Sequence, residues 1–136
     1  MKKTLYLLIA MLMLFGMLPQ PAAAYPLIFM YVSNFELVTK GPPTKVVSYV
    51  TATILEAVND QPLSKATVTL RQTNDCPGWI TTDTSTARTN LQGVVKFNVE
   101  LPADCTIYLM VEDVVKTGYL YEAEYNTVDV RIVVNP

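Results

Sequence analysis

Apolar and polar side chains alternate with a period of two in most of the chain after residue 45. In the segment 46–54, for example, Val50, Ala52 and Ile54 are apolar and the residues between them are threonines. Because successive side chains of a strand point to opposite faces of a sheet, this alternation predicts half-buried strands. Four other segments repeat the pattern: 66–71, 95–100, 107–111 and 128–134. Two more segments, 79–90 and 119–125, are rich in threonine or tyrosine. We expect about seven strands and no helix of useful length.

Residues typical of turns separate these segments at intervals of about ten residues. Asparagine, aspartate, proline or glycine occurs in each of five connections: 59–62, 74–78, 90–93, 102–104 and 116–118. Short strands joined by such turns are typical of two antiparallel sheets packed face to face. The pattern therefore predicts an all-β antiparallel sandwich.

Parts of this pattern resemble a known group of domains. In the stretch 54–70, a strand ends in an Asp-containing turn, a proline follows, and the run Ala-Thr-Val-Thr-Leu begins at Ala66. The stretch 86–97 has a threonine-rich step, then Gly93 and Phe97, and Gly118-Tyr119 follows later. These features resemble the carboxypeptidase regulatory-like and bacterial Ig-like domains, which include transthyretin-like relatives.

The resemblance covers roughly residues 46–134 and implies an Ig-like arrangement of the sandwich. The sequence departs from the group at Lys65, where the group usually has glycine, and at Asn90, where it usually has aspartate. The shared residues shape a scaffold, so the resemblance implies an architecture and not an activity.

The first 24 residues have the features of a secretory signal peptide. Lys2 and Lys3 precede an apolar run from Leu5 to Leu18, and small residues follow up to Ala24. The run fits the roughly 7–15 residues of a signal peptide core, whereas a membrane-spanning helix needs about 20. An uncleaved anchor is the alternative. We expect cleavage after Ala24, so that the chain consists of a leader (1–24), an apolar strand with a proline-containing linker (25–45) and an Ig-like sandwich (46–136).

Removal of the leader takes Lys2 and Lys3 with it and changes the formal net charge from −2 to −4. Binding of nucleic acid or of an anionic membrane surface requires grouped lysines and arginines. The remaining chain has no such group, so we expect neither partner and no membrane span after cleavage. We expect the protein to be secreted, whether it remains in a periplasm, at the cell surface or in the medium.

Cys76 and Cys105 are the two cysteines of the chain. In an oxidising compartment, two cysteines of one small domain most simply form a disulfide. Antiparallel strands place the turns around these residues at the same end of the sandwich, which favours the bond. The alternatives are two free thiols or a redox site, although a redox site more typically has a Cys-x-x-Cys motif.

The chain has no histidine. Histidine is the usual proton-transfer group near neutral pH and the commonest ligand of zinc and copper, so most hydrolytic and metal chemistry is excluded. The enzymes among transthyretin-like and related folds also depend on histidines. The aspartates show no D-x-D-x-D spacing of a calcium loop. We therefore expect no catalytic residue, no cofactor and no metal site.

Exposed aromatic residues are one way in which a sandwich domain binds sugars or protein partners. Trp79 lies in one segment and three tyrosines lie close together in another. These candidates are Trp79, Tyr119, Tyr121 and Tyr125. The alternative is that they pack against strands, as the tyrosine corner of sandwich folds does.

The segment that follows the leader is apolar at both alternating positions. It consists of Leu27, Ile28, Phe29, Met30, Tyr31 and Val32. A strand of this kind must be covered on both faces, either by its own domain or by a neighbouring chain. Gly41, Pro42 and Pro43 separate it from the next strand, so it could be a donor strand that completes the open sheet of another subunit. The alternative is an ordinary first strand of its own domain.

The sequence thus predicts a secreted, non-catalytic Ig-like module with a structural or interaction role. One alternative is a filament or surface-layer subunit that assembles by donor-strand exchange. A weaker alternative is a carbohydrate-binding module that uses Trp79 and the tyrosines. The sequence names no partner.

We expect the exported protein to begin at Tyr25, because Ala22 and Ala24 supply the small residues that signal peptidase requires. The intact mass of the protein recovered from outside the cytoplasm measures this directly. A mature chain that still carries Lys2 and Lys3 would show that the apolar run is an anchor.

Overall fold

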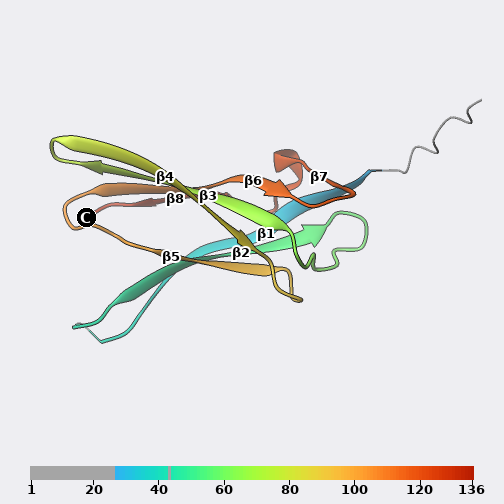
Figure 1. Cartoon of the computed structure of the whole chain (residues 1–136), viewed down its shortest axis with the longest axis horizontal. Helices are drawn as coiled ribbons and strands as arrows, with labels where there is room; N and C mark the ends of the chain where they lie inside the picture. Colours follow the sequence, from blue (N-terminus) through green and yellow to red (C-terminus); the bar gives the residue numbers. More distant parts are fainter. Residues whose placement is uncertain (1–26, 43) are drawn as a thin grey trace, which may run out of the picture.

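The fold consists of two four-stranded sheets packed face to face (Figure 1). We describe it from a computed structural model, which describes residues 27–42 and 44–136. The predicted leader lies outside the described residues. The elements in chain order are β1 (Ile28–Lys40), β2 (Val47–Glu56), β3 (Thr67–Cys76), β4 (Trp79–Arg88), β5 (Val94–Val99), β6 (Thr106–Val115), β7 (Tyr119–Tyr121), the short 3-10 helix η1 (Ala123–Tyr125) and β8 (Arg131–Val134).

The strand order is β5-β2-β1-β7 in the first sheet, sheet A, and β4-β3-β6-β8 in the second, sheet B. Neighbouring strands are antiparallel except for β1 and β7, which are parallel and pair Ile28 with Tyr119. The predicted all-β antiparallel sandwich is thus confirmed at the level of two packed sheets.

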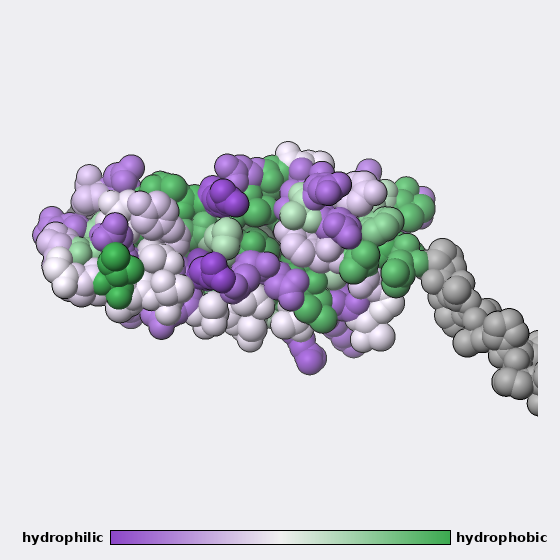
Figure 2. Space-filling model, turned by 90° about the horizontal axis from the view of Figure 1, so that it is seen from above, coloured by the Kyte–Doolittle hydropathy of each residue, from purple (hydrophilic) through white to green (hydrophobic). Residues whose placement is uncertain are grey.

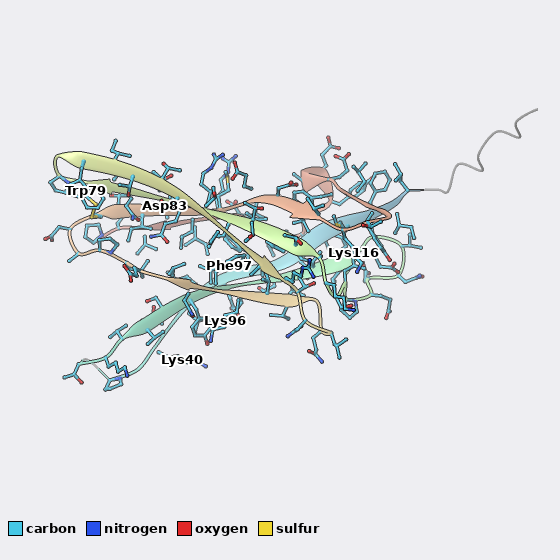
Figure 3. The ribbon with its side chains drawn as sticks, in the orientation of Figure 1. Lys40, Trp79, Asp83, Lys96, Phe97 and Lys116 are labelled. Atoms are coloured by element: carbon cyan, nitrogen blue, oxygen red, sulfur yellow. A yellow bond between two sulfur atoms is a disulfide. The ribbon has the colours of Figure 1, made fainter. Side chains whose placement is uncertain are left out.

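The core lies between the sheets and follows the period-two pattern. In β2, Val50, Ala52 and Ile54 are fully buried, whereas the threonines between them are partly exposed. Phe97 of β5, which is labelled in Figure 3, and Leu109 of β6 come from opposite sheets and belong to the same buried cluster. Alternation that was visible in the sequence therefore identifies the core face of both sheets.

The described residues contain eight strands, one more than the expected seven. The additional strand is β1, which pairs with β2 from Met30 to Lys40. The predicted boundary after residue 45 therefore falls between two hydrogen-bonded neighbours in one sheet. A bulge between Val32 and Asn34 interrupts the pairing once.

The predicted strand 119–125 ends early, and this expectation is corrected by the structure. β7 stops at Tyr121, and η1 follows because the amide of Tyr125 donates to the carbonyl oxygen of Glu122. The segment 128–134 forms strand β8 only from Arg131 onward. In this region the chain passes from β6 of sheet B to β7 of sheet A and then back to β8 of sheet B. The segment 119–125 therefore cannot form a strand over its whole length.

Turn residues also take the conformations that their connections require. Gly93 has a φ of 73°, and a Cβ atom there would lie 2.5 Å from the carbonyl oxygen of Ile54. The amide of Ile54 in turn donates to the carbonyl oxygen of Gly93. The close approach of these two backbones requires glycine at position 93.

Cys76 and Cys105 form a disulfide with a Cα–Cα distance of 4.2 Å. Cys76 is the last residue of β3, and Cys105 immediately precedes β6. Because β3 and β6 are antiparallel neighbours, the two cysteines lie at the same end of sheet B. The predicted disulfide and its position at one end of the sandwich are confirmed.

We expect the double substitution Cys76→Ser and Cys105→Ser to lower the free energy of unfolding by about 2–4 kcal/mol while leaving the fold intact. The reason is that the bond limits the freedom of the unfolded chain between two residues 29 positions apart. Urea unfolding followed by circular dichroism measures the difference. Two titratable thiols in the unfolded, unreduced wild-type protein would contradict the account.

Candidate binding surfaces

The structure separates Trp79 from the three tyrosines. Trp79 follows the turn between β3 and β4, at the end of the sandwich that carries the disulfide. The tyrosines belong to β7 and η1, which lie beside the start of β1. Figure 3 shows Trp79 at one end and Lys116, whose Nζ lies 5.8 Å from the ring of Tyr119, at the other. The four aromatic residues therefore do not form one binding platform.

Two of the tyrosines make contacts within the domain. The hydroxyl of Tyr121 accepts a hydrogen bond of 2.9 Å from Nδ2 of Asn126. The ring of Tyr125 lies 5.2 Å from the ring of Phe29 on β1. Trp79 and Tyr125 are equally exposed, at 48% each, and Trp79 lies at the tip of its hairpin.

The apolar segment has cover on both of its faces from Phe29 to Val32 within one chain, whereas Leu27 at its start is 62% exposed. Met30 and Val32 point into the core and are essentially fully buried. Phe29 and Tyr31 point to the opposite face, where the ring of Tyr125 lies against Phe29. The hydroxyl of Tyr31 donates a 2.6 Å hydrogen bond to Asp60 in the β2–β3 turn. The described chain thus places this segment as an internal strand of its own sheet.

Asn126 joins the start of β1 to the region after β7. Its Oδ1 accepts a 2.8 Å hydrogen bond from the amide of Val32, next to the bulge of β1. Its Nδ2 donates to Tyr121, and the amide of the next residue, Thr127, donates to the carbonyl oxygen of Val32. Pairing of β1 with β7 ends at Met30 and Tyr121, so the side chain of Asn126 satisfies a backbone donor of β1 that lies beyond the end of β7.

The pKa of Tyr31 is raised above its ordinary value of 10.0, mainly because its hydroxyl donates to Asp60, and further by burial and by the negative charge of Asp60. A phenol with a raised pKa favours the folded state while it is protonated. The contribution is complete below pH 10 and is lost as the pH rises through the raised pKa. At neutral pH this contact therefore keeps its proton and holds β1 against the turn.

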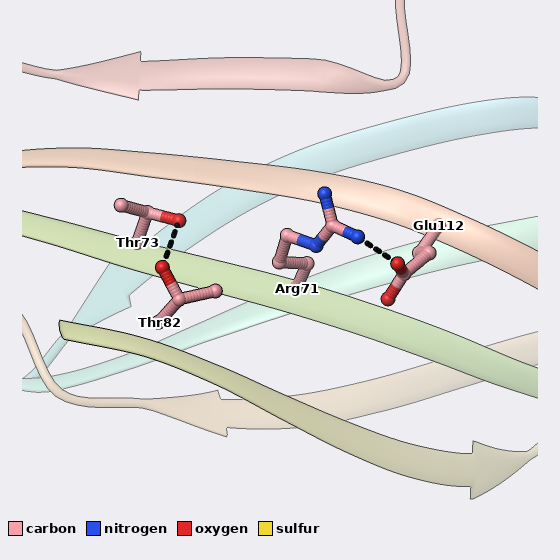
Figure 4. Close-up of polar contacts among 4 residues, drawn as sticks. All are labelled: Arg71, Thr73, Thr82 and Glu112. Atoms are coloured by element: carbon pink, nitrogen blue, oxygen red, sulfur yellow. Dashed lines mark hydrogen bonds and ion pairs between the residues drawn. The ribbon is translucent and has the colours of Figure 1, made fainter.

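The outer face of sheet B carries polar contacts across its strands (Figure 4). The hydroxyls of Thr73 on β3 and Thr82 on β4 lie 3.1 Å apart. Arg71 on β3 forms an ion pair with Glu112 on β6. Figure 2, which views the molecule from the sheet B side, shows hydrophobic side chains scattered among hydrophilic ones on this face.

A shallow cavity of about 230 Å³ lies on the same face. Tyr108 and Met110 of β6 line it together with Val133 of β8, and Arg71 and Arg131 also belong to its walls. Tyr108 is 44% exposed and Val133 is 53% exposed. Tyrosine, methionine and arginine are the residue types that are enriched at the centres of protein interfaces.

The sequence analysis did not identify this surface. A signal was present, because Tyr108 and Met110 occupy the polar side of the alternation whose apolar side is Ile107, Leu109 and Val111. Large, mainly apolar residues on the outward side of a strand can indicate a binding surface. Their neighbours on the face, Arg71 and Arg131, come from distant segments and could not be inferred from the pattern alone.

A second, polar groove lies where the edges of the two sheets face each other. Along β3 the inward-facing residues change from the buried Val68 and Leu70 to Gln72 and Asn74. Gln72 donates a 2.8 Å hydrogen bond to the carbonyl oxygen of Glu100, after β5. With Asp83 of β4 these residues line a groove of about 260 Å³.

The part of the chain that the structure describes contains neither a metal-binding cluster nor a membrane-spanning helix. Across residues 27–42 and 44–136, no three acidic or cysteine side chains are grouped so that they could hold a metal ion. Within the same ranges no helix has the length and hydrophobicity that a membrane span requires.

Comparison with known proteins gave no family model, no curated protein and no solved structure that matches this chain.

Proposed function

We propose that the protein is an exported, non-catalytic Ig-like module that binds a protein partner through the outer face of sheet B. The observation that carries the proposal is the exposed set of Tyr108, Met110 and Val133 between Arg71 and Arg131. These side chains project from neighbouring strands of a disulfide-linked sheet. A surface held on such strands is fixed before the partner arrives, which lowers the entropic cost of binding.

The order of the strands supports the Ig-like assignment. With the strands lettered along the chain, β1, β2 and β5 correspond to A, B and E of one Ig sheet, and β3 and β6 correspond to C and F of the other. β4 pairs with β3, whereas in constant-type Ig domains the fourth strand pairs with the fifth. The order therefore favours an Ig-like sandwich with its fourth strand on the sheet of C and F.

Two positions at which the sequence departs from the resembled group are compatible with the group's geometry. Lys65 has a φ of 58°, in the left-handed region where the group usually has glycine. Oδ1 of Asn90 accepts hydrogen bonds of 3.0 Å from the amides of Gln92 and Val94, as an aspartate would. Both departures leave the expected turns in place, which supports the resemblance.

Export is supported by the leader pattern and by the disulfide. Disulfides persist in secreted and periplasmic proteins and are rare in the cytosol. A non-catalytic role is supported by the absence of histidine from the sequence. The function then depends on contact between surfaces.

Two other functions have weaker physical support. Donor-strand exchange through β1 would break the pairing of β1 with β2 and the bonds to Asp60 and Asn126. Carbohydrate binding by one aromatic platform would need Trp79 and the tyrosines to lie together, and they lie at opposite ends. The outer face of sheet B needs no rearrangement to bind.

A photo-crosslinking amino acid in place of Tyr108, introduced in cells of the source organism, tests the proposal. We expect one defined protein adduct from this position, because Tyr108 lies in the wall of the cavity. Arg131→Ala in the same background is expected to reduce the adduct by roughly tenfold or more, since arginines at interface centres commonly contribute above about 2 kcal/mol.

The same crosslinker in place of Tyr49 is the control. Tyr49 lies on the outer face of sheet A, with Nζ of Lys96 3.8 Å from the centre of its ring. We expect no adduct there. Equal adducts from both positions, or none from Tyr108, would contradict a binding face on sheet B.

A further inference from the structure

Among the described residues, β4 is the longest strand at the edge of a sheet. It has ten residues, whereas the other edge strands β5, β7 and β8 have six, three and four. β4 pairs with β3 over its whole length without a shift in register. Its other edge is therefore not interrupted by a bulge, and in the described chain no backbone hydrogen bond joins it to β5.

The hairpin turn determines which residues of β4 face the open edge. Cys76 and Trp79 pair across the two-residue turn Pro77-Gly78, so they form a hydrogen-bonded pair. Every second residue from Trp79 then bonds to β3. The alternate residues direct their amide and carbonyl groups to the open edge, and these are Ile80, Thr82, Thr84, Thr86 and Arg88.

This edge has few of the features that normally prevent pairing between strands of different chains. Lysines, prolines, bulges, short length and inward-pointing charges are the usual protections of an edge strand. β4 contains none of the first three, and its charged residues are Asp83 and the terminal Arg88. Five of its residues are threonine or serine, and threonine favours extended backbone. The strand is thus suited to accept a partner strand.

We propose that β4 pairs antiparallel with β4 of a second copy of this chain. The pairing joins the two B sheets into one sheet of eight strands across a two-fold axis. Homo-oligomers with one two-fold axis are the commonest kind, and in such an interface the same segment contacts itself.

Charge decides the register of this pair. A two-fold axis perpendicular to the sheet relates one residue of β4 to the same residue of the second copy, directly opposite. The residue at the axis can be Asp83 or Thr84, among others, and this choice sets the register. An axis at Asp83 places two carboxylates directly opposite each other, which is unfavourable. An axis at Thr84 places Asp83 opposite the hydroxyl of Ser85 and Thr82 opposite Thr86. The second register converts repulsion into a hydrogen bond.

The dimer has a consequence for the proposed binding face. The axis is perpendicular to sheet B, so the outer faces of both copies point in the same direction. Two copies of the cavity between Arg71 and Arg131 then lie on one continuous surface. The dimer does not depend on that face, since β4 and the cavity are at different places on the sheet.

Sedimentation velocity on the purified wild-type protein, across concentrations up to several hundred micromolar, tests the dimer. We expect a concentration-dependent dimer that Thr84→Lys weakens at least tenfold, because the two lysines would stand directly opposite each other at the axis. Val115→Lys is the control. Val115 is 57% exposed on β6, an internal strand of the same sheet, so this variant should dimerise like the wild type.

Single cysteines test the register. Under mild oxidation, Thr84→Cys should form an interchain disulfide, since Cα atoms of a hydrogen-bonded pair lie about 5.5 Å apart. In an equimolar mixture of Thr82→Cys and Thr84→Cys, the mixed disulfide should form much more slowly, because only an axis at Asp83 places residue 82 directly opposite residue 84. Val115→Cys measures the rate of random collisions.

Three results would overturn the proposal. The first is a wild-type protein that stays monomeric at all concentrations. The second is a dimer that Thr84→Lys leaves unchanged, because such a dimer must use another surface. The third is a mixture in which the disulfide between residues 82 and 84 forms faster than the disulfide between two copies of residue 84, which would place the axis at Asp83 and oppose its carboxylates. None of these results bears on the crosslinking experiment at Tyr108.

Discussion

The fold depends on how the chain covers a strand that is apolar on both faces. Met30 and Val32 are buried in the core, so β1 must lie inside the sandwich. Phe29 and Tyr31 then point away from the core, where water would otherwise reach them. The β2–β3 turn and η1 cover this second face through Asp60 and Tyr125. Burial of such large side chains contributes roughly 1.5–3 kcal/mol each, which is a considerable part of the stability of a small domain.

The position of β1 explains the unusual path of the chain after β6. The chain leaves sheet B, forms the three residues of β7 parallel to β1, turns through η1 and returns to sheet B as β8. Asn126 lies in this detour and bonds to Val32. The detour therefore closes the side of β1 that lies beyond the end of β7. The tyrosines of this region act in that closure, whereas the outer face of sheet B and the edge of β4 are left free for partners.

The sequence predicted the features that depend on local pattern. The alternation in 46–54 and 107–111 located β2 and β6 and their buried faces, and turn residues located the connections. The pairing of Cys76 with Cys105 followed from the number of cysteines and the antiparallel order. These features could be predicted because a period of two and a turn each involve residues close in the chain.

The remaining features depend on contacts between distant residues. The bond between Val32 and Asn126 joins residues 94 positions apart, and no local pattern indicates it. The same holds for the candidate face, where Arg71, Tyr108 and Arg131 come from three strands. Tyr108 and Met110 gave a partial signal as large residues on the polar side of an alternating strand. The role of β1 was ambiguous, because an apolar strand of this kind has the same sequence whether its own domain or a neighbour covers it.

Native-state hydrogen exchange on the intact protein tests the central claim, that β1 is a permanent internal strand, most directly. If the account is correct, the β1 amides that bond to β2 exchange only through global unfolding, at the same slow rate as those of β3 and β6. If β1 amides instead exchange orders of magnitude faster while β3 and β6 remain protected, β1 detaches under native conditions. That result would contradict the account and favour a strand that is exchanged between chains.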